Sequence, residues 1–96
     1  MSNSVIQRQL PRPHPGVIFN TVSSGAVLLH APTEIYFGLN AVGSRVWQLL
    51  PPECESFEEL CNRLMVEYPD VPAEQIAEDV TELLNALENQ GLVVSP

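Results

Sequence analysis

Residues 17–40 read VIFNTVSSGAVLLHAPTEIYFGLN and decide the fold, because they hold three short apolar runs separated by turn signals. The runs over 17–22, 26–30 and 35–39 are rich in β-branched and aromatic residues, which favour strands. Ser-Ser-Gly separates the first two runs, and Pro32 presets the backbone of the second turn. Connections this short favour antiparallel neighbours, so we predict a three-stranded meander with 26–30 in the centre.

Three helices are predicted after the sheet, over residues 41–50, 57–68 and 72–90. Asn40 suits the N-cap of the first, since its side chain can accept from free amides of the first turn. Ser56 precedes the second and begins the Ser-x-x-Glu pattern of a capping box. Each range repeats apolar residues at three- and four-residue spacing, which gives each helix one buried face. The order βββααα predicts an α+β domain with a winged helix-turn-helix-like architecture.

The end of the third helix carries a specific signal, because Gly91 follows its last apolar turn. Glycine readily adopts the left-handed backbone that closes a helix in a Schellman motif, and Leu92 is then placed to contact Leu87. Residues 92–94 are predicted to form a short extended segment.

Ninety-six residues with 45% apolar and 17% charged side chains are typical of one globular domain. We assign residues 16–96 to this domain and residues 1–15 to a flexible, proline-rich tail. Pro11, Pro13 and Pro15 remove every second amide donor from the end of the tail and favour an extended, unpaired backbone.

Charge is distributed unevenly along the chain. The net charge is −8, there is no lysine, and residues 51–96 hold eleven of the twelve acidic residues. Proteins that bind nucleic acid need clustered Lys and Arg, so we do not expect nucleic acid as a partner. No run of 18 apolar residues occurs and residues 1–9 are mostly polar. We therefore expect no membrane span, no secretory signal and a cytoplasmic location.

No group of residues points to catalysis, a metal ion or a cofactor. Cys54 and Cys61 are seven residues apart and lack the spacing of zinc ligands, so we expect two inert thiols. His14 lies in the tail, and His30 ends a predicted strand, where a surface position without a catalytic role is the ordinary interpretation. Nucleotide-binding, hydrolase and metalloprotease motifs do not occur. We predict that the protein is not an enzyme.

The strand over residues 34–38 is a candidate binding site. In a meander it has an unpaired outer edge, and Glu34 is the only charged residue that protects this edge. An exposed edge beside an apolar helix suits strand addition by a peptide. Alternatively, residues 92–95 or a second copy of the chain cover the edge, and the sequence pattern leaves both options open. The acidic residues of helix 72–90 are interpreted either as a solvated face or as contacts to a peptide.

The order of several short motifs resembles that of one protein family. The motifs are AVLLH at 26–30, IYFGLN at 35–40, Gly43, VWQLL at 46–50 and LENQGL at 87–92. Together they are similar to the PqqD-like family, the recognition elements for precursors of ribosomally made, modified peptides (RiPPs). The likeness covers residues 17–94, and none of its motifs is catalytic.

The resemblance implies a winged-helix-like domain that binds the leader segment of a RiPP precursor peptide and delivers it to a maturation enzyme. In this family the leader lies as an added strand on the third strand, in the groove beside the third helix. The strand backbone would supply hydrogen bonds, and apolar side chains would form pockets, although we expect Val80 and Leu87 to be core residues. The peptide-binding residues carried over by position are Glu34, Ile35, Tyr36, Phe37, Gly38, Ile76, Asp79, Val80, Leu83, Leu84 and Leu87.

Two branches of the family contain stand-alone chains of this size. In lasso-peptide maturation the module works beside a leader peptidase and a cyclase, and the Leu-Asn, Gly and Trp-x-Leu-Leu pattern looks closest to that branch. The other branch is PqqD itself, the partner of a radical-SAM enzyme that makes pyrroloquinoline quinone. Residues 31–35 depart from the Arg-Thr-Gly-Arg turn common in lasso modules, so the branch stays open.

Two other functions are compatible with the predicted fold, a winged-helix transcription factor and a dimeric adaptor without a peptide ligand. A recognition helix needs basic residues, and Arg45 and Arg63 are the only ones after residue 40. An adaptor would hide the edge of 34–38 in a dimer, which size-exclusion chromatography would detect.

Overall fold

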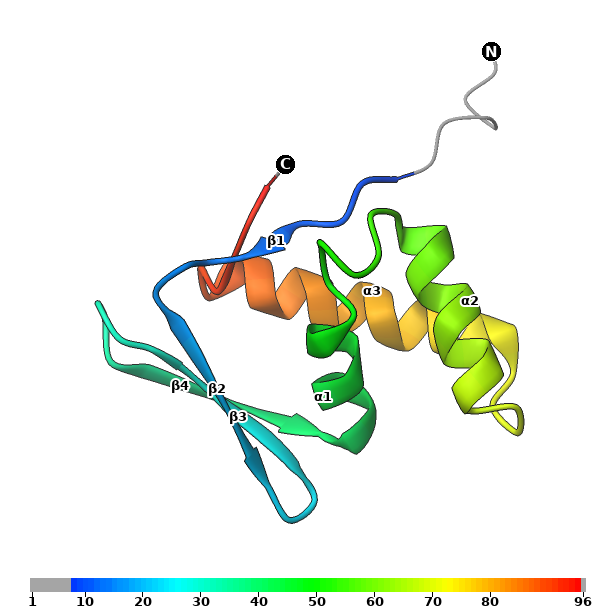
Figure 1. Ribbon diagram of the computed structural model, residues 1–96, viewed down its shortest axis with the longest axis horizontal. Helices are drawn as coiled ribbons and strands as arrows, with labels where there is room; N and C mark the ends of the chain where they lie inside the picture. The colour runs from blue at the N-terminus through cyan, green and yellow to red at the C-terminus, as the bar shows by residue number, and fades with distance from the viewer. Residues whose placement is uncertain (1–7, 96) are drawn as a thin grey trace.

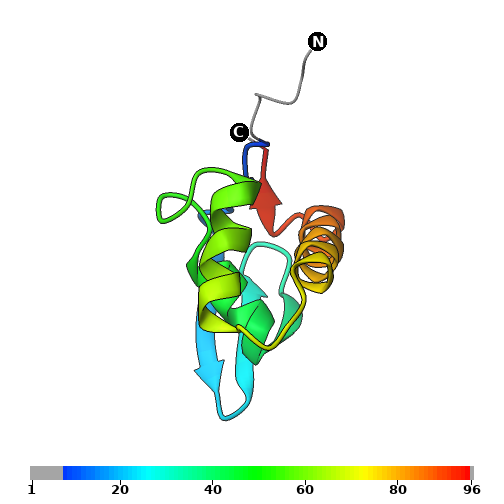
Figure 2. The same cartoon turned by 90° about the vertical axis from the view of Figure 1, so that its right-hand side faces the viewer.

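The computed structural model describes residues 8–95, which form a three-stranded sheet, three helices and a pair of short strands (Figure 1). The sheet lies to one side of the helices in Figure 1, and Figure 2 views the same arrangement from the helical side. The order confirms the predicted α+β class, βββααα, and adds one short strand at each end. The elements are β1 (Arg12–Pro13), β2 (Val17–Val22), β3 (Gly25–His30), β4 (Ile35–Asn40), α1 (Ala41–Gln48), α2 (Phe57–Glu67), α3 (Ala73–Asn89) and β5 (Val93–Val94).

β2, β3 and β4 form the predicted antiparallel meander, with β3 between its two neighbours. Alternate residues of β3 are buried, and Leu28 pairs with Phe19 of β2 and Phe37 of β4. This face of the sheet packs against the helical core. His30 lies on the same face and is only 8% exposed. The expected surface position of His30 was wrong, because strand alternation turns it inward together with Leu28.

α1 begins directly after β4, as predicted. The Asn40 side chain caps it by accepting a hydrogen bond from the Gly43 amide at 2.7 Å. The helix ends at Gln48, whereas the sequence predicts residue 50, and Leu49 and Leu50 continue as a buried turn. Trp47 is 8% exposed and belongs to the core, so α1 fastens the end of the sheet to the other helices.

α2 begins at the predicted cap but with a shifted capping box. Ser56 Oγ accepts from the Glu59 amide at 3.1 Å. The Glu59 carboxylate in turn accepts from the amide of Glu55 at 3.0 Å, one residue before the cap. α3 follows Pro72, which takes the N-cap position just before the first helical residue. Both helix starts therefore lie where the local signals place them.

Gly91 closes α3 in the predicted Schellman motif. Its φ is +72°, in the left-handed region that favours glycine. The amides of Gly91 and Leu92 donate to the carbonyls of Glu88 and Leu87, at 3.1 and 3.0 Å. Leu92 is fully buried, and the chain continues into β5, which is the predicted extended segment.

Residues 8–15, named here the N-terminal strap, are paired and packed, which corrects the expected unpaired tail over this part of the chain. β1 pairs with β5, and Leu10 is only 2% exposed. Each proline follows a residue that keeps its amide donor. The Leu10 amide donates to the Glu55 carbonyl at 3.2 Å, and the His14 amide donates to the Leu92 carbonyl at 3.0 Å. Residues 1–7 lie outside the described part of the chain.

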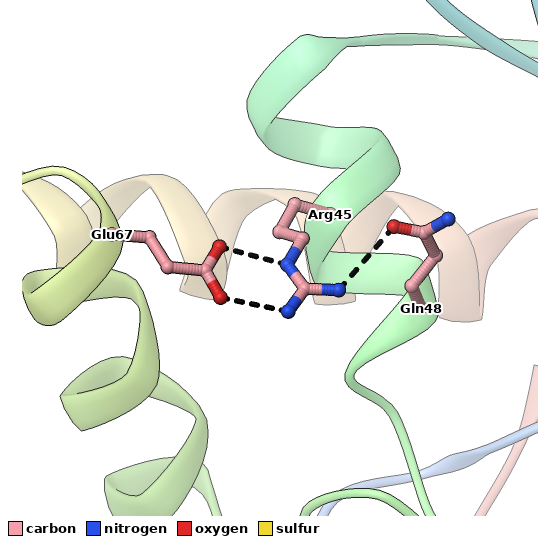
Figure 3. A network of polar contacts seen from close by, with 3 residues as sticks. All are labelled: Arg45, Gln48 and Glu67. Atoms are coloured by element: carbon pink, nitrogen blue, oxygen red, sulfur yellow. Dashed lines mark hydrogen bonds and ion pairs between the residues drawn. The ribbon is translucent and has the colours of Figure 1, made fainter.

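A bidentate ion pair joins α1 to α2 (Figure 3). Arg45 Nε and Nη2 each donate to one carboxylate oxygen of Glu67 at 2.7 Å, and Nη1 reaches Gln48 Oε1 at 3.5 Å. Arg45 lies in the last turn of α1, and Glu67 is the last residue of α2. The planar fork of two parallel hydrogen bonds fixes both distance and orientation between these helix ends.

Candidate functional site

A groove of about 450 Å³ lies between β4 and α3, with α1 and the end of α2 completing its walls. Its lining is mostly apolar, and Asp79 and Glu82 are the charged residues on it. β4 reaches the groove because it is an edge strand whose inward residues, Phe37 and Leu39, face the helices. The groove therefore combines apolar walls, an acidic rim on α3 and the backbone of one strand.

The outer edge of β4 is free of pairing within residues 8–95. β4 pairs with β3 along one edge, and it is the last strand in the order β2-β3-β4. β5 pairs with β1 instead, which removes the alternative that residues 92–95 cover the edge. Unpaired N–H and C=O groups beside an apolar groove are what an added peptide strand needs.

Six of the eleven residues carried over from the family line this groove. Val80 is 1% exposed and lies deep in the core, as expected, whereas Phe37 and Leu83 are partly buried and reach the surface. Asp79 and Gly38 are exposed. The six lining residues are Phe37, Gly38, Ile76, Asp79, Val80 and Leu83.

The other five residues carried over lie outside the groove lining. Glu34 lies in the turn before β4, Ile35 is the first residue of β4, and Tyr36 is 70% exposed on the opposite face of the sheet. Leu87 is fully buried, as expected for a core residue. Leu84 is 9% exposed and borders a smaller hollow beneath the N-terminal strap. Ile35 and Tyr36 would meet an added strand through the β4 backbone, whereas Leu84 and Leu87 lie on α3 outside the groove lining.

Sequence reasoning missed the walls that α1, α2 and the loop before α3 contribute. An amphipathic pattern identifies the inward stripe of a helix, but it does not tell which part of the stripe a neighbour leaves uncovered. One usable signal was Val71, an apolar residue between Asp70 and Pro72 in the loop before α3. The missed apolar lining residues on these walls are Val42, Val46, Leu64, Tyr68 and Val71, and Leu39 of β4 was missed as well.

A family model described as coenzyme PQQ synthesis protein D (PqqD) matches residues 25–93. The chain belongs to the PqqD family. The match confirms the resemblance inferred from the order of motifs and begins at β3. A solved structure of TbiB1 in complex with the TbiA(beta) leader peptide is 35% identical, with a TM-score of 0.75. The similarity spans 85% of this chain and 93% of that one. No curated protein matches the chain.

The charge on the groove of this PqqD-family chain is acidic. Asp79 and Glu82 lie along the groove side of α3, and Gln75 Nε2 donates to Asp79 Oδ1 at 2.8 Å. The whole chain carries a net charge of −8. A peptide with cationic side chains near α3 would approach this rim faster, and the effect would weaken as salt screens the charges.

The thiols of this PqqD-family chain are buried and free. Burial raises the pKa of both Cys54 and Cys61, so both remain in the unreactive thiol form near neutral pH. Residues 8–95 contain no group of three or more His, Cys, Asp or Glu side chains that could hold a metal ion. Each helix in the described part of the chain is too short or too polar to cross a bilayer.

Proposed function

We propose that this PqqD-family chain binds the leader segment of a RiPP precursor peptide and presents it to a maturation enzyme. The observation that carries the proposal is the unpaired edge of β4 beside an apolar groove. The 35% identity to TbiB1, whose structure holds the TbiA(beta) leader peptide, supports the same use of the fold here.

In the proposed complex the leader adds as a strand to β4. The backbone of residues 35–38 supplies hydrogen bonds, which give affinity without sequence preference. Ile76 and Leu83 provide apolar contacts for alternate leader side chains, and these contacts select the leader. Asp79 on the rim favours leaders with a cationic residue near α3.

The chain itself performs no chemistry in this proposal, and the reaction belongs to its partner. We assign the module to lasso-peptide maturation in the cytoplasm, where the partner would be a leader peptidase acting with a cyclase. The motif pattern of Leu-Asn, Gly and Trp-x-Leu-Leu supports this branch. The alternative is a PqqD-type module that serves a radical-SAM enzyme.

The arrangement of arginines argues against DNA binding. Arg8, Arg12 and Arg45 each lie 3.7 Å or less from a glutamate carboxylate, so their charge is locally balanced. Arg63 is the one other basic residue, and the twelve acidic residues of the chain would repel phosphates. A transcription factor therefore fits this structure less well than a peptide-binding module.

Leader binding is tested by fluorescence anisotropy. Labelled peptides would be synthesised from the N-terminal parts of short open reading frames beside this gene and titrated with the purified protein. We expect one leader to bind with a submicromolar dissociation constant and its core peptide not to bind. Failure of every such leader to bind a folded protein would contradict the proposal.

The groove assignment is tested by Leu83→Asp, with Val66→Asp as the matched control. Leu83 lines the groove, whereas Val66 lies on α2 and is 80% exposed. A charge in an apolar groove should weaken leader binding at least about tenfold, while the control binds normally. Circular dichroism would verify that both variants are folded. Equal binding by the two variants would show that the leader lies elsewhere.

A further inference from the structure

The face of the sheet turned away from the helices is uncharged, open and mainly apolar, with Asn20 between Ile18 and Val22 on β2. It is named here the outer sheet face and is formed by the outward residues of β2, β3 and β4. Ile18, Leu29 and Tyr36 pair across the three strands in one row of this face. Ile18 and Tyr36 are 49% and 70% exposed, and Val22 is 52% exposed. Figure 1 shows the sheet projecting beside the helices, of which α1 packs against β3 and β4.

The composition of this face is unusual for a solvated sheet. One-sided antiparallel sheets normally alternate apolar residues inside with polar or charged ones outside. Here the three strands contain no charged residue, although the chain carries a net charge of −8. Clustered exposed aromatic and β-branched side chains mark surfaces that bind another protein. The outer sheet face is therefore a second surface, distinct from the groove.

The outer sheet face is continuous with the proposed leader site. A strand added to β4 would extend the same sheet, and its side chains would alternate between the two faces. Half of the leader side chains would enter the groove, and the other half would continue the row that ends at Tyr36. A protein that docks on this face would touch the module and the bound leader together.

We propose that the outer sheet face is the docking surface for the maturation enzyme, which contacts it together with the outward side chains of the bound leader. This inference rests on the proposed function. The enzyme is expected to present an uncharged, apolar patch, because the face offers no charge to pair with. Because the enzyme would also contact the bound leader, its affinity for the module should rise when leader is present. Because the face is uncharged, this affinity should change little with salt, in contrast to that of an interface on the acidic helices.

The test uses the double variant Ile18→Asn, Val22→Asn and the control Val66→Asn. Ile18 and Val22 lie on β2, separated from β4 by the whole of β3, so the leader site stays intact. Val66 is equally apolar and 80% exposed, but it lies on α2. The partner is the purified peptidase or radical-SAM enzyme encoded beside this gene, and its affinity is measured by biolayer interferometry with and without synthetic leader.

We expect the double variant to bind leader as the wild type does and to bind the enzyme at least about tenfold more weakly. The control should match the wild type in both assays. Unchanged enzyme affinity in a folded double variant would overturn the inference, and so would a wild-type homodimer that the substitutions dissociate. If the wild-type protein did not bind leader at all, the proposed function would be refuted instead. Failure of the docking inference and failure of the proposed function are therefore distinguishable.

Discussion

Glu34 adopts a left-handed backbone immediately before β4 begins. Its φ is +57°, and its amide donates to the His30 carbonyl at 2.7 Å, which closes the turn between β3 and β4. This conformation costs an ordinary L-residue about 1–2 kcal/mol, whereas Asn visits it more readily. Pro32 predicts that a turn occurs here, but no sequence signal places the left-handed residue at a glutamate.

Replacing Glu34 with Asn should therefore stabilise the protein. The expected gain in the free energy of unfolding is up to about 1 kcal/mol, because Asn tolerates the left-handed region at lower cost. Urea denaturation followed by circular dichroism at neutral pH measures it. Glu34→Val is the matched comparison. It should lower the free energy of unfolding, because a β-branched residue is strained in the left-handed region. A higher free energy of unfolding for the Val variant and a lower one for the Asn variant would contradict the turn geometry.

At the scale of elements, Arg45 and Glu67 tie the ends of α1 and α2 beside the groove. The hydrogen bond from Arg45 holds the pKa of the Glu67 carboxyl below its ordinary range. A carboxyl with a lowered folded-state pKa contributes stability above its unfolded pKa, and this contribution is lost as the pH falls through the folded pKa. Both side chains are about one-third exposed, so the pair is partly screened by solvent.

Glu67→Gln should lower the free energy of unfolding by less than about 1 kcal/mol at neutral pH. The difference from wild type should shrink on acidification below about pH 5 and vanish once Glu67 is protonated. Urea denaturation of both proteins across this pH range measures it. A difference that grows as the pH falls would show that the pair does not stabilise the fold.

Local signals predicted the elements well, because each acts within a few residues. The caps at Asn40 and Ser56 and the closure at Gly91 form the hydrogen bonds that their spacing indicates. The helix end at Leu50 was misplaced because that residue is apolar and buried without being helical. The Glu59 carboxylate accepts from the amide of Glu55, four residues before it, instead of from the amide of Ser56, three residues before it.

At the scale of the whole molecule, the N-terminal strap joins the two ends of the domain. Leu10 enters the core, β1 pairs with β5, and the Phe57 amide donates to the Arg8 carbonyl at 2.8 Å. These contacts link residues more than 40 positions apart, so no local pattern in the proline-rich segment predicts them. The α1 and α2 walls of the groove were missed for the same reason, since they exist only once the helices pack.

Leu10→Ala should destabilise the domain by about 2–5 kcal/mol, because it removes a fully buried side chain. Val94→Ala is the matched control on the paired strand, since Val94 is 40% exposed and should cost less than about 1 kcal/mol. Thermal and urea unfolding compare them. If Leu10→Ala were as stable as wild type, the strap would be a loose tail after all.

A leader peptide that adds as a strand to β4 should protect backbone amides of that strand, and amide exchange measures this protection. Hydrogen–deuterium exchange would be followed by NMR with and without the synthetic leader. The amides of β4 that point away from β3 should become protected by at least about tenfold, while the free edge of β2 should not change. Leader binding without new protection in β4, or with protection at β2, would contradict the account.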